Sequence, residues 1–370
     1  MKLIVNIARI LTGALFIFSG LVKAIDPRGL AYKMQEFFEA WANSGFMPGL
    51  MENLGHYALA FSLIMITLEV VVGLALLLGW RTKLTTWILL LLILFFTFLT
   101  SYVLFSGKIR ACGCFGDCIP ITPVQTFTKD IILLLLSVLL LWKRKYITPV
   151  LKPAAAGIVV LLGIVATLFL QWYVLRYLPI KDCLPYKKGN NILELRKMPV
   201  DAVPDKFAMS FIYEKNGEKK EYTAENLPDS SWNFVDRKQT LLEAGKNNVP
   251  PISDFILTTM SGNDTTDALL SQTGTYYILF IKDIEGPGKD FTADKALWDA
   301  AKKAGVPFAI VTSQKEKVLQ RFGQDATVLT CDATALKTAA RADEVLYKMN
   351  GPVVQNKWGW PAFKNVTVVQ

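Results

Sequence analysis

The sequence predicts an α-helical membrane bundle followed by a water-soluble α/β domain. Of the 370 residues, 52% are hydrophobic and 19% are charged, whereas roughly a quarter of the residues of a soluble globular protein are charged. The excess of apolar residues is uneven, because long apolar runs fill residues 3–178 and most of the charge follows Lys181. This change in composition predicts the boundary between the two halves.

Five apolar stretches are long enough to cross a bilayer, which takes about 20 residues per helix. Backbone amides inside hydrocarbon must be satisfied within their own segment, so each stretch is predicted to be a helix. The first stretch is not followed by an A-x-A-like cleavage site, which indicates a retained helix rather than a signal peptide. The stretches are Leu3–Val22, Tyr57–Gly79, Leu84–Phe105, Val124–Leu141 and Ala154–Tyr177.

The chain is expected to divide into four segments. Residues 1–145 form most of the bundle, and residues 146–180 contain its fifth helix. Residues 181–271 form an extracytoplasmic connector with a β-hairpin, whose Asn216-Gly217 pair is typical of a type I′ turn. Residues 272–370 form the α/β domain, because buried strands alternate there with amphipathic helices.

Charge and cysteine placement favour an amino terminus in the cytoplasm. The short loops that would then be cytoplasmic are dense in Lys and Arg, as the positive-inside rule requires. Three of the five cysteines would then share one outer loop in an oxidising space, where disulfides persist. The expectation is a bacterial inner-membrane protein that contacts lipid and has a periplasmic carboxy-terminal domain. The net charge of +9 does not indicate nucleic-acid binding, because the basic residues are scattered or flank apolar runs.

Ionisable residues lie in or beside the apolar stretches, and Arg9 and Glu69 are the informative ones among them. A charge at the bilayer centre is costly, so it usually faces the bundle interior and pairs. Arg9 and Glu69 are predicted to lie at compatible depths and to pair, either as a structural ion pair or as the lining of a quinone or proton path. Lys23 is expected to extend to the lipid headgroups, and Asp130 opens the fourth stretch.

Three motifs occur in order along the first 145 residues. They are Arg9, Gly13, Phe16, Ser19, Gly20 and Lys23, then Glu69, Gly73, Gly79, Trp80 and Arg81, then Cys112-Gly-Cys-Phe-Gly116 and Asp130. The chain resembles the DoxX family and its relative, the methylamine-utilisation MauE family, and its layout is similar to that of DoxX-type proteins of Bacteroidetes-like bacteria. The resemblance implies a four-helix bundle, to which this chain adds a fifth helix. It also implies a link to quinones or to periplasmic thiol chemistry in a partner protein.

The outer loop carries Cys112, Cys114 and Cys118 as candidate redox residues. A bond between Cys112 and Cys114 would close a small strained ring, and strain makes a disulfide labile. Either cysteine could instead pair with Cys118 at lower strain, so that three cysteines could exchange one bond. Nearby Lys108 and Arg110 favour a thiolate. A permanent structural disulfide is the main alternative. A metal site is a weaker one, since zinc normally takes four ligands and the single histidine, His56, lies in another loop.

Cys183, a few residues beyond the fifth helix, is a further candidate partner for these thiols. Cys331 follows a buried strand, where a lone cysteine usually acts as an inert hydrophobic residue.

The order of strands and helices after residue 272 looks like that of a thioredoxin-like domain. The motif Cys-x-x-Cys is replaced by residues 282–288, which contain no cysteine, and the position of the family's cis-proline reads Ala342-Asp-Glu-Val345. This domain is therefore expected to dock a protein partner or to cover the outer mouth of the bundle.

Two functions remain open at this point. The first is a membrane thiol–disulfide system that passes electrons from a periplasmic partner to a quinone. The second is a non-catalytic accessory or assembly factor with structural cysteines. A transporter is least favoured, because the apolar stretches contain few polar residues and no visible break.

Overall fold

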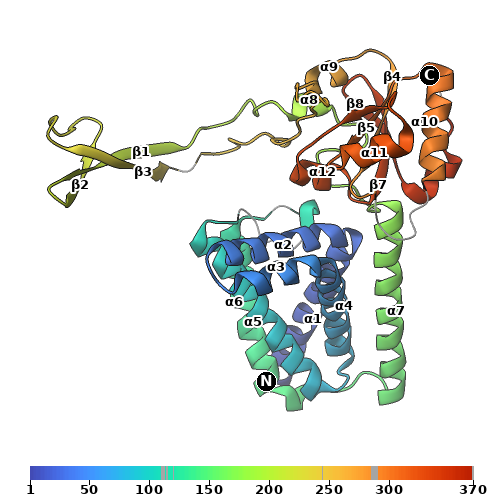
Figure 1. Ribbon diagram of the computed structural model, residues 1–370. Helices are drawn as coiled ribbons and strands as arrows, with labels where there is room; N and C mark the ends of the chain where they lie inside the picture. Colours follow the sequence, from blue (N-terminus) through green and yellow to red (C-terminus); the bar gives the residue numbers. More distant parts are fainter. Residues whose placement is uncertain (110–112, 114–115, 120, 244, 285–290, 369–370) are drawn as a thin grey trace.

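The protein is described by a computed structural model over residues 1–109, 113, 116–119, 121–243, 245–284 and 291–368. Five long apolar helices form the membrane half, and Figure 1 shows the α/β domain at one end of them. The prediction of five spanning helices followed by an α/β domain is confirmed. The five helices are α1 (Lys2–Ile25), α4 (Ala58–Leu78), α5 (Thr82–Ser106), α6 (Pro123–Trp142) and α7 (Pro153–Tyr177).

Close packing of α1 on α4 explains two glycines of the sequence motif. A Cβ atom on Gly13 would lie 2.7 Å from the Leu77 side chain, and one on Gly73 would lie 2.7 Å from the Gly13 carbonyl oxygen. Only glycine allows the two backbones to approach this closely, as in other helix pairs within membranes. The bundle core beneath this contact includes Phe16, Leu76 and Leu89.

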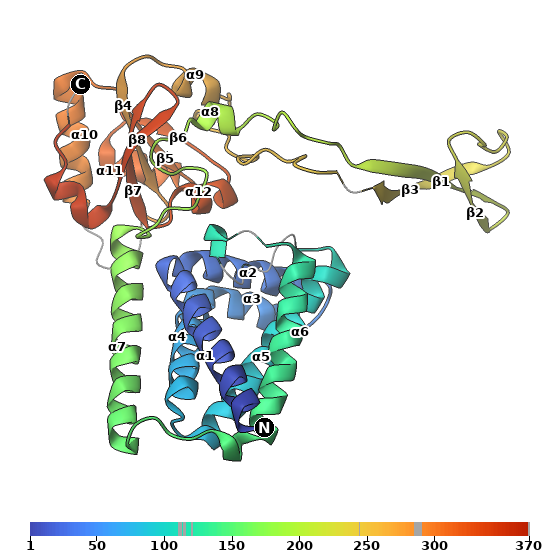
Figure 2. The same cartoon turned by 180° about the vertical axis from the view of Figure 1, so that it is seen from behind.

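Helix α7 is the most exposed of the five and stands beside the others (Figure 2). It contacts α4, where Gly163 packs against Leu74 and the Gln171 amide donates a hydrogen bond to Thr67 Oγ1 at 2.9 Å. Its remaining surface is apolar and exposed, for example at Leu162 and Phe169. Such a surface is suited to lipid.

Two shorter helices, α2 (Pro27–Asn43) and α3 (Pro48–His56), lie across the end of the bundle that faces the α/β domain (Figure 1). Neither helix is predicted from the sequence. The Asp26 carboxylate caps α2 by accepting from the Gly29 amide at 3.1 Å, and Pro27 occupies the first helical position. The apolar face of α2 buries Met34 and Phe37, so this helix forms the floor on which the α/β domain rests.

A five-stranded sheet forms the α/β domain, in the order β6-β5-β4-β7-β8. Strands β4, β5 and β6 are parallel, whereas β7 and β8 are antiparallel additions at the other edge. Strands alternate with helices along this domain, as the sequence predicts. The strands are β4 (Thr275–Ile281), β5 (Phe308–Thr312), β6 (Thr327–Leu329), β7 (Glu344–Asn350) and β8 (Val353–Gly359).

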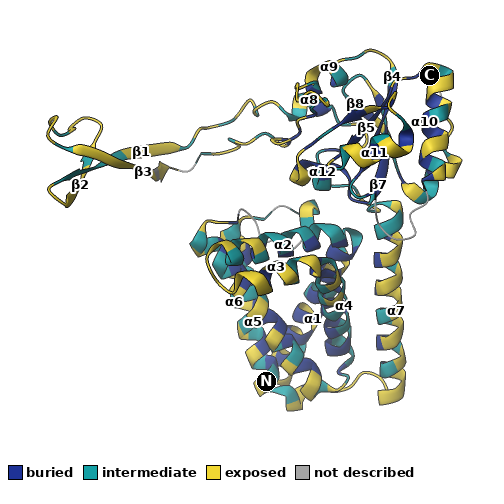
Figure 3. Ribbon diagram, in the orientation of Figure 1, coloured by how far each residue is buried: buried dark blue, intermediate teal, exposed yellow. Residues whose placement is uncertain are grey.

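Helices cover both faces of this sheet. On one face α10 and α11 contribute Leu297, Trp298 and Phe322 to the core. The opposite face packs against α12, through Leu336 and Ala339, and against α8. Figure 3 shows the resulting buried centre. These helices are α8 (Ile192–Leu195), α9 (Thr266–Leu270), α10 (Thr292–Ala304), α11 (Lys315–Phe322) and α12 (Ala333–Ala339), and the 3-10 turns are η1 (Gly116–Cys118), η2 (Arg144–Tyr146) and η3 (Trp360–Asn365).

A three-stranded arm projects sideways from the α/β domain (Figures 1 and 2). It consists of β1 (Lys206–Lys215), β2 (Glu218–Thr223) and β3 (Asn233–Glu243), in the order β2-β1-β3. Asn216 and Gly217 have φ values of 53° and 81°, as the predicted type I′ turn requires. The third strand, β3, is not predicted from the sequence.

Candidate functional site

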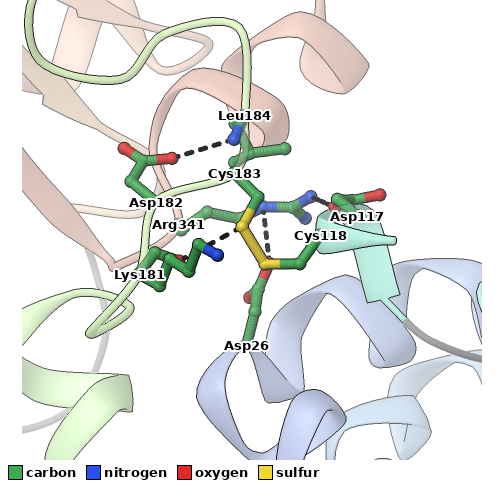
Figure 4. The surroundings of a disulfide bond; sticks show 8 residues. All are labelled: Asp26, Asp117, Cys118, Lys181, Asp182, Cys183, Leu184 and Arg341. Atoms are coloured by element: carbon green, nitrogen blue, oxygen red, sulfur yellow. Dashed lines mark hydrogen bonds and ion pairs between the residues drawn. A yellow bond between two sulfur atoms is a disulfide. The ribbon is translucent and has the colours of Figure 1, made fainter. Parts of the chain in front are cut away.

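A disulfide joins Cys118 in η1 to Cys183, which follows α7 (Figure 4). Their Cα atoms are 5.0 Å apart, and 65 residues separate them in the sequence. The bond ties the loop between α5 and α6 to the segment that enters the α/β domain. The structure therefore brings together two of the four cysteines that the sequence singles out as thiol candidates.

The other two candidates, Cys112 and Cys114, lie outside the described residues, as does Arg110. Gly113 between the two cysteines is described. Its φ of 70° favours glycine, and a Cβ atom there would lie 3.1 Å from Lys33 Cγ in α2. The Gly116 amide donates to the Gly113 carbonyl at 2.9 Å. The loop thus passes over α2 on its way to the disulfide.

Arg341 of the α/β domain forms ion pairs with two carboxylates of the membrane half. Its guanidinium lies 3.2 Å from Asp26 Oδ2 and 2.5 Å from Asp117 Oδ2 (Figure 4). Asp26 caps α2, and Asp117 directly precedes Cys118. One buried side chain therefore connects α2, η1 and the α/β domain beside the disulfide.

Burial and neighbouring charges shift the pKa values of two groups in this contact. Burial raises the pKa of Asp26, and the positive charge of Arg341 opposes this effect. Burial lowers the pKa of Lys282 well below its usual range, and the positive charge of Arg28 adds to the shift. Lys282 donates a hydrogen bond to the Tyr32 hydroxyl at 3.0 Å.

Further polar contacts surround Tyr32 of α2. Arg28 pairs with Asp343 at 2.8 Å, and Lys337 Nζ donates to Gln35 Oε1 at 3.3 Å. Three cationic side chains also lie over the tyrosine ring, at centroid distances of 5.4–5.7 Å. These cations are Lys282, Lys337 and Arg341. The α/β domain thus contacts the bundle mainly through cations that face acidic and aromatic groups.

A polar cavity of about 380 Å³ lies between α2 and α12, next to the disulfide. Helix α2 contributes Lys33 and Glu36 to its walls, and α12 contributes Lys337. Cys183 is also part of the lining. The cavity is the size of a small-ligand or side-chain site.

The predicted pair between Arg9 and Glu69 is wrong, because Arg9 binds backbone carbonyls instead. Its guanidinium donates to the carbonyls of Leu76 and Thr148 at 2.8 Å each, and to that of Leu77 at 2.5 Å. These oxygens belong to the last turn of α4 and to the loop before α7. Arg9 therefore closes the end of the bundle farthest from the α/β domain.

Glu69 pairs with Lys23, and the prediction that Lys23 extends to the headgroups is also wrong. Both side chains are buried, and the carboxylate additionally accepts from Ser19 Oγ at 3.1 Å. The space beside them measures about 10 Å³, which is roughly the minimum for one water molecule. A quinone ring does not fit there in this structure.

Asp130 is fully buried between α5 and α6. It pairs with Lys129 at 2.5 Å and accepts from Thr100 Oγ1 at 3.1 Å. All the intramembrane candidates from the sequence are therefore satisfied within the bundle, away from the disulfide.

Cys331 lies in the core of the α/β domain as a free thiol, and burial raises its pKa to about 12. Thiolate formation is suppressed there, so this cysteine is unreactive. Among the described residues, no group of His, Cys, Asp and Glu side chains is arranged to hold a metal ion.

Sequence reasoning misses the interdomain residues. Asp26 before Pro27 is a detectable helix-start signal. Nothing in the sequence around Arg341 or Tyr32 indicates that they meet, because their proximity depends on how two separate domains dock.

Five apolar helices topped by a disulfide-linked α/β domain define an integral membrane protein with a cysteine-containing interdomain site. Residues 1–143 match the family described as methylamine utilisation protein MauE. The membrane half of this chain is therefore similar to the MauE family. Residues 207–244, a range that includes most of the arm, match a domain of unknown function (DUF8463).

A similar sequence is Protein TlpB of Flavobacterium psychrophilum, which is 34% identical over 135 residues. The alignment covers 36% of this chain and 35% of that protein, so the chain matches about a third of the length of this curated relative. No solved structure matches. The likeness to DoxX and the thioredoxin-like nature of the α/β domain stay predictions.

Proposed function

We propose that this protein catalyses thiol–disulfide exchange at the membrane surface. The Cys118–Cys183 disulfide would accept electrons from a dithiol of a protein partner, and Cys112 and Cys114 would pass them on to a membrane quinone. Oxidation of two thiols to a disulfide releases two electrons and two protons, and reduction of a quinone to a quinol consumes both. The scheme therefore balances with a quinone as the oxidant.

The pairing of Cys118 with Cys183 is the observation that carries this proposal. A sulfur forms one disulfide at a time, so this pairing leaves Cys112 and Cys114 for a second bond four to six residues away in the same loop. Two neighbouring pairs can exchange by attack of a thiolate on a disulfide sulfur. A loop with a purely structural role needs one bond only.

Nearby cations support the same chemistry. Lys33 packs against Gly113, and Arg341 lies beside Asp117 and the disulfide. Positive charge stabilises a thiolate over a thiol and increases the reactive fraction. The proposal also places the α/β domain in the periplasm and the amino terminus in the cytoplasm of a bacterial inner membrane, where a partner with cysteines is available for oxidation.

An accessory role is the second candidate function, and a specific observation favours it. The disulfide and the Arg341 ion pairs join the two domains, as a purely structural staple would. In this case the α/β domain or the arm binds a protein partner and no electrons flow.

Quinone reduction by the purified protein in nanodiscs distinguishes the two functions. A reduced dithiol peptide and a soluble quinone are supplied, and quinol formation is followed by absorbance. We expect turnover in the wild type, and its loss in Cys112→Ser, Cys114→Ser and Cys183→Ser. Cys331→Ala is the matched control, because this cysteine is buried and remote in function. No turnover in the wild type would favour the accessory role.

A further inference from the structure

We infer that the cavity between α2 and α12 is the entrance for the partner's thiol, and that Cys183 is the sulfur it attacks. The expected ligand is the thiolate of a cysteine side chain on a protein partner. The inference rests on the proposed exchange activity and adds to it the substrate-binding site and the order of sulfur attack.

The two cysteines of the disulfide differ in their relation to the cavity. Cys183 belongs to its lining together with Leu184 and Pro185, whereas Cys118 is not among the described lining residues. On that side of the disulfide the lining contains Asp117, which directly precedes Cys118. A nucleophile that enters through the cavity therefore reaches Cys183 first.

The lining of the cavity is neutral overall, with three cations and three carboxylates. Lys33, Lys337 and Arg341 line it from both domains. The acidic groups of the lining are largely paired, since Glu36 pairs with Lys33 at 2.9 Å and Asp117 pairs with Arg341. Glu39 is the remaining carboxylate. Lys337 donates to Gln35 and pairs with no carboxylate among the described contacts, so it is the cation available to attract an anionic nucleophile and to stabilise it on arrival.

The chemical step balances without a further oxidant. The incoming thiolate forms a bond to Cys183 Sγ, the Cys118–Cys183 bond breaks, and Cys118 leaves as a thiolate. The product is a mixed disulfide between the partner and Cys183. The leaving sulfur remains next to Asp117 and its partner Arg341, and it belongs to the loop that carries Cys112 and Cys114. Attack on Cys118 Sγ would instead release the thiolate on Cys183, which belongs to the segment after α7 and not to that loop.

This arrangement also gives the α/β domain a role in exchange without a cysteine pair of its own. One wall of the cavity is α12, so the site is complete only when the α/β domain rests on α2. The contacts of Arg341 and Tyr32 hold the two walls together.

The regiochemistry of a single-turnover reaction tests the inference. Oxidised full-length protein in nanodiscs is mixed with a short peptide that contains one cysteine, quenched with acid and alkylated with N-ethylmaleimide. Peptide mapping by mass spectrometry then locates the adduct. We expect the peptide on Cys183 rather than on Cys118, with an excess of about tenfold or more, because accessibility controls which sulfur is attacked.

A predominance of the peptide on Cys118, or equal amounts on both, would overturn the inference and leave the proposed exchange activity standing. Absence of any adduct would overturn both. A cavity-filling variant adds a second readout. Thr338→Trp, in the cavity wall, is expected to slow the peptide reaction by about tenfold while a small reagent such as dithiothreitol reacts at nearly the wild-type rate. Thr327→Trp, on β6 and outside the cavity lining, is the matched control.

Discussion

Ionised side chains are buried in two regions of this molecule, the interior of the bundle and the contact between the bundle and the α/β domain. Lys23 and Glu69 in the bundle are 3% and 1% exposed and are enclosed by helix packing. In the interdomain contact, Arg341 is 8% exposed, but the side chain of its partner Asp117 is 39% exposed. The first pair can separate only if the helices separate. The second pair lies at the contact between the two domains, next to the cavity and the disulfide.

The comparison indicates which charged groups belong to the fold and which belong to the site. The motif residues Ser19, Lys23 and Glu69 satisfy one another inside the bundle. The groups near the disulfide come from both domains. We therefore expect substitutions in the bundle to affect stability, and substitutions in the interdomain contact to affect domain docking and thiol reactivity.

Removal of one partner of the bundle pair should have the largest effect. Glu69→Ala leaves the Lys23 charge buried without its carboxylate, which is expected to cost about 3–5 kcal/mol of unfolding free energy. Denaturation in mixed micelles measures the loss. The double variant Lys23→Met/Glu69→Leu should recover most of it, and a Glu69→Ala protein as stable as the wild type would contradict the pairing.

Loss of the disulfide should have the second-largest effect. Cys183→Ser opens a loop of 65 residues, for which chain entropy gives an upper bound of about 4 kcal/mol with a fully unfolded reference chain. Because α6 and α7 stay in the membrane, the loss should appear chiefly as undocking of the α/β domain. Hydrogen exchange of α2 and of residues 184–195 reports it. Unchanged protection in the variant would mean that ion pairs alone hold the domains together.

Arg341→Met should weaken the docking of the α/β domain on the bundle by about 2 kcal/mol. A charge-assisted interaction is lost, and Asp26 stays partly buried without its cation. The readout is again hydrogen exchange of α2. Arg321→Met is the control, because Arg321 is exposed on α11 and contacts only the Phe291 ring among the described interactions. Equal effects of the two substitutions would argue against a special role of Arg341.

Docking should depend on pH through Lys282. Its pKa is lowered in the docked state, so the undocked state binds the proton more tightly. Docking is therefore strongest above the ordinary lysine pKa of about 10.4 and weakens as the pH falls from there towards the lowered pKa. Lys282→Met should remove this dependence, as measured by hydrogen exchange of α2 between pH 6 and pH 10. An unchanged pH profile would exclude Lys282 as its origin.

Replacement of the arm should have the smallest effect on the stability of the bundle and of the interdomain contact. Val203 and Lys246 exchange backbone hydrogen bonds at its base, so a short glycine linker can replace residues 206–243. The docked core is expected to change in stability by less than about 0.5 kcal/mol, because surface changes away from the core are usually this small. Thermal unfolding measures this. A large loss would show that the arm supports the α/β domain.

Much of the fold follows from sequence pattern. Apolar runs predict the spanning helices, and Asn216-Gly217 predicts the hairpin turn. Helices α2 and α3 escape prediction because they are amphipathic and lie between two apolar runs, so neither length nor hydropathy distinguishes them from a loop.

The candidate site is less predictable. Arg9 binds main-chain carbonyls, which every residue possesses, so no side-chain pattern identifies its partners. Lys23 pairs with Glu69 through helix packing geometry. The meeting of Arg341 with Asp26 requires the docking of two domains, and local sequence carries no information on that arrangement.

The redox state of Cys118 and Cys183 in growing cells tests the central claim most directly. Cells are quenched with acid, and free thiols are labelled with a mass tag, with and without inhibition of quinone turnover. Our account predicts a mixture of oxidised and reduced pairs that shifts towards reduced thiols when quinone turnover is blocked. A pair that stays fully oxidised under both conditions, and after a brief pulse of mild reductant, would contradict it and identify the disulfide as a structural staple.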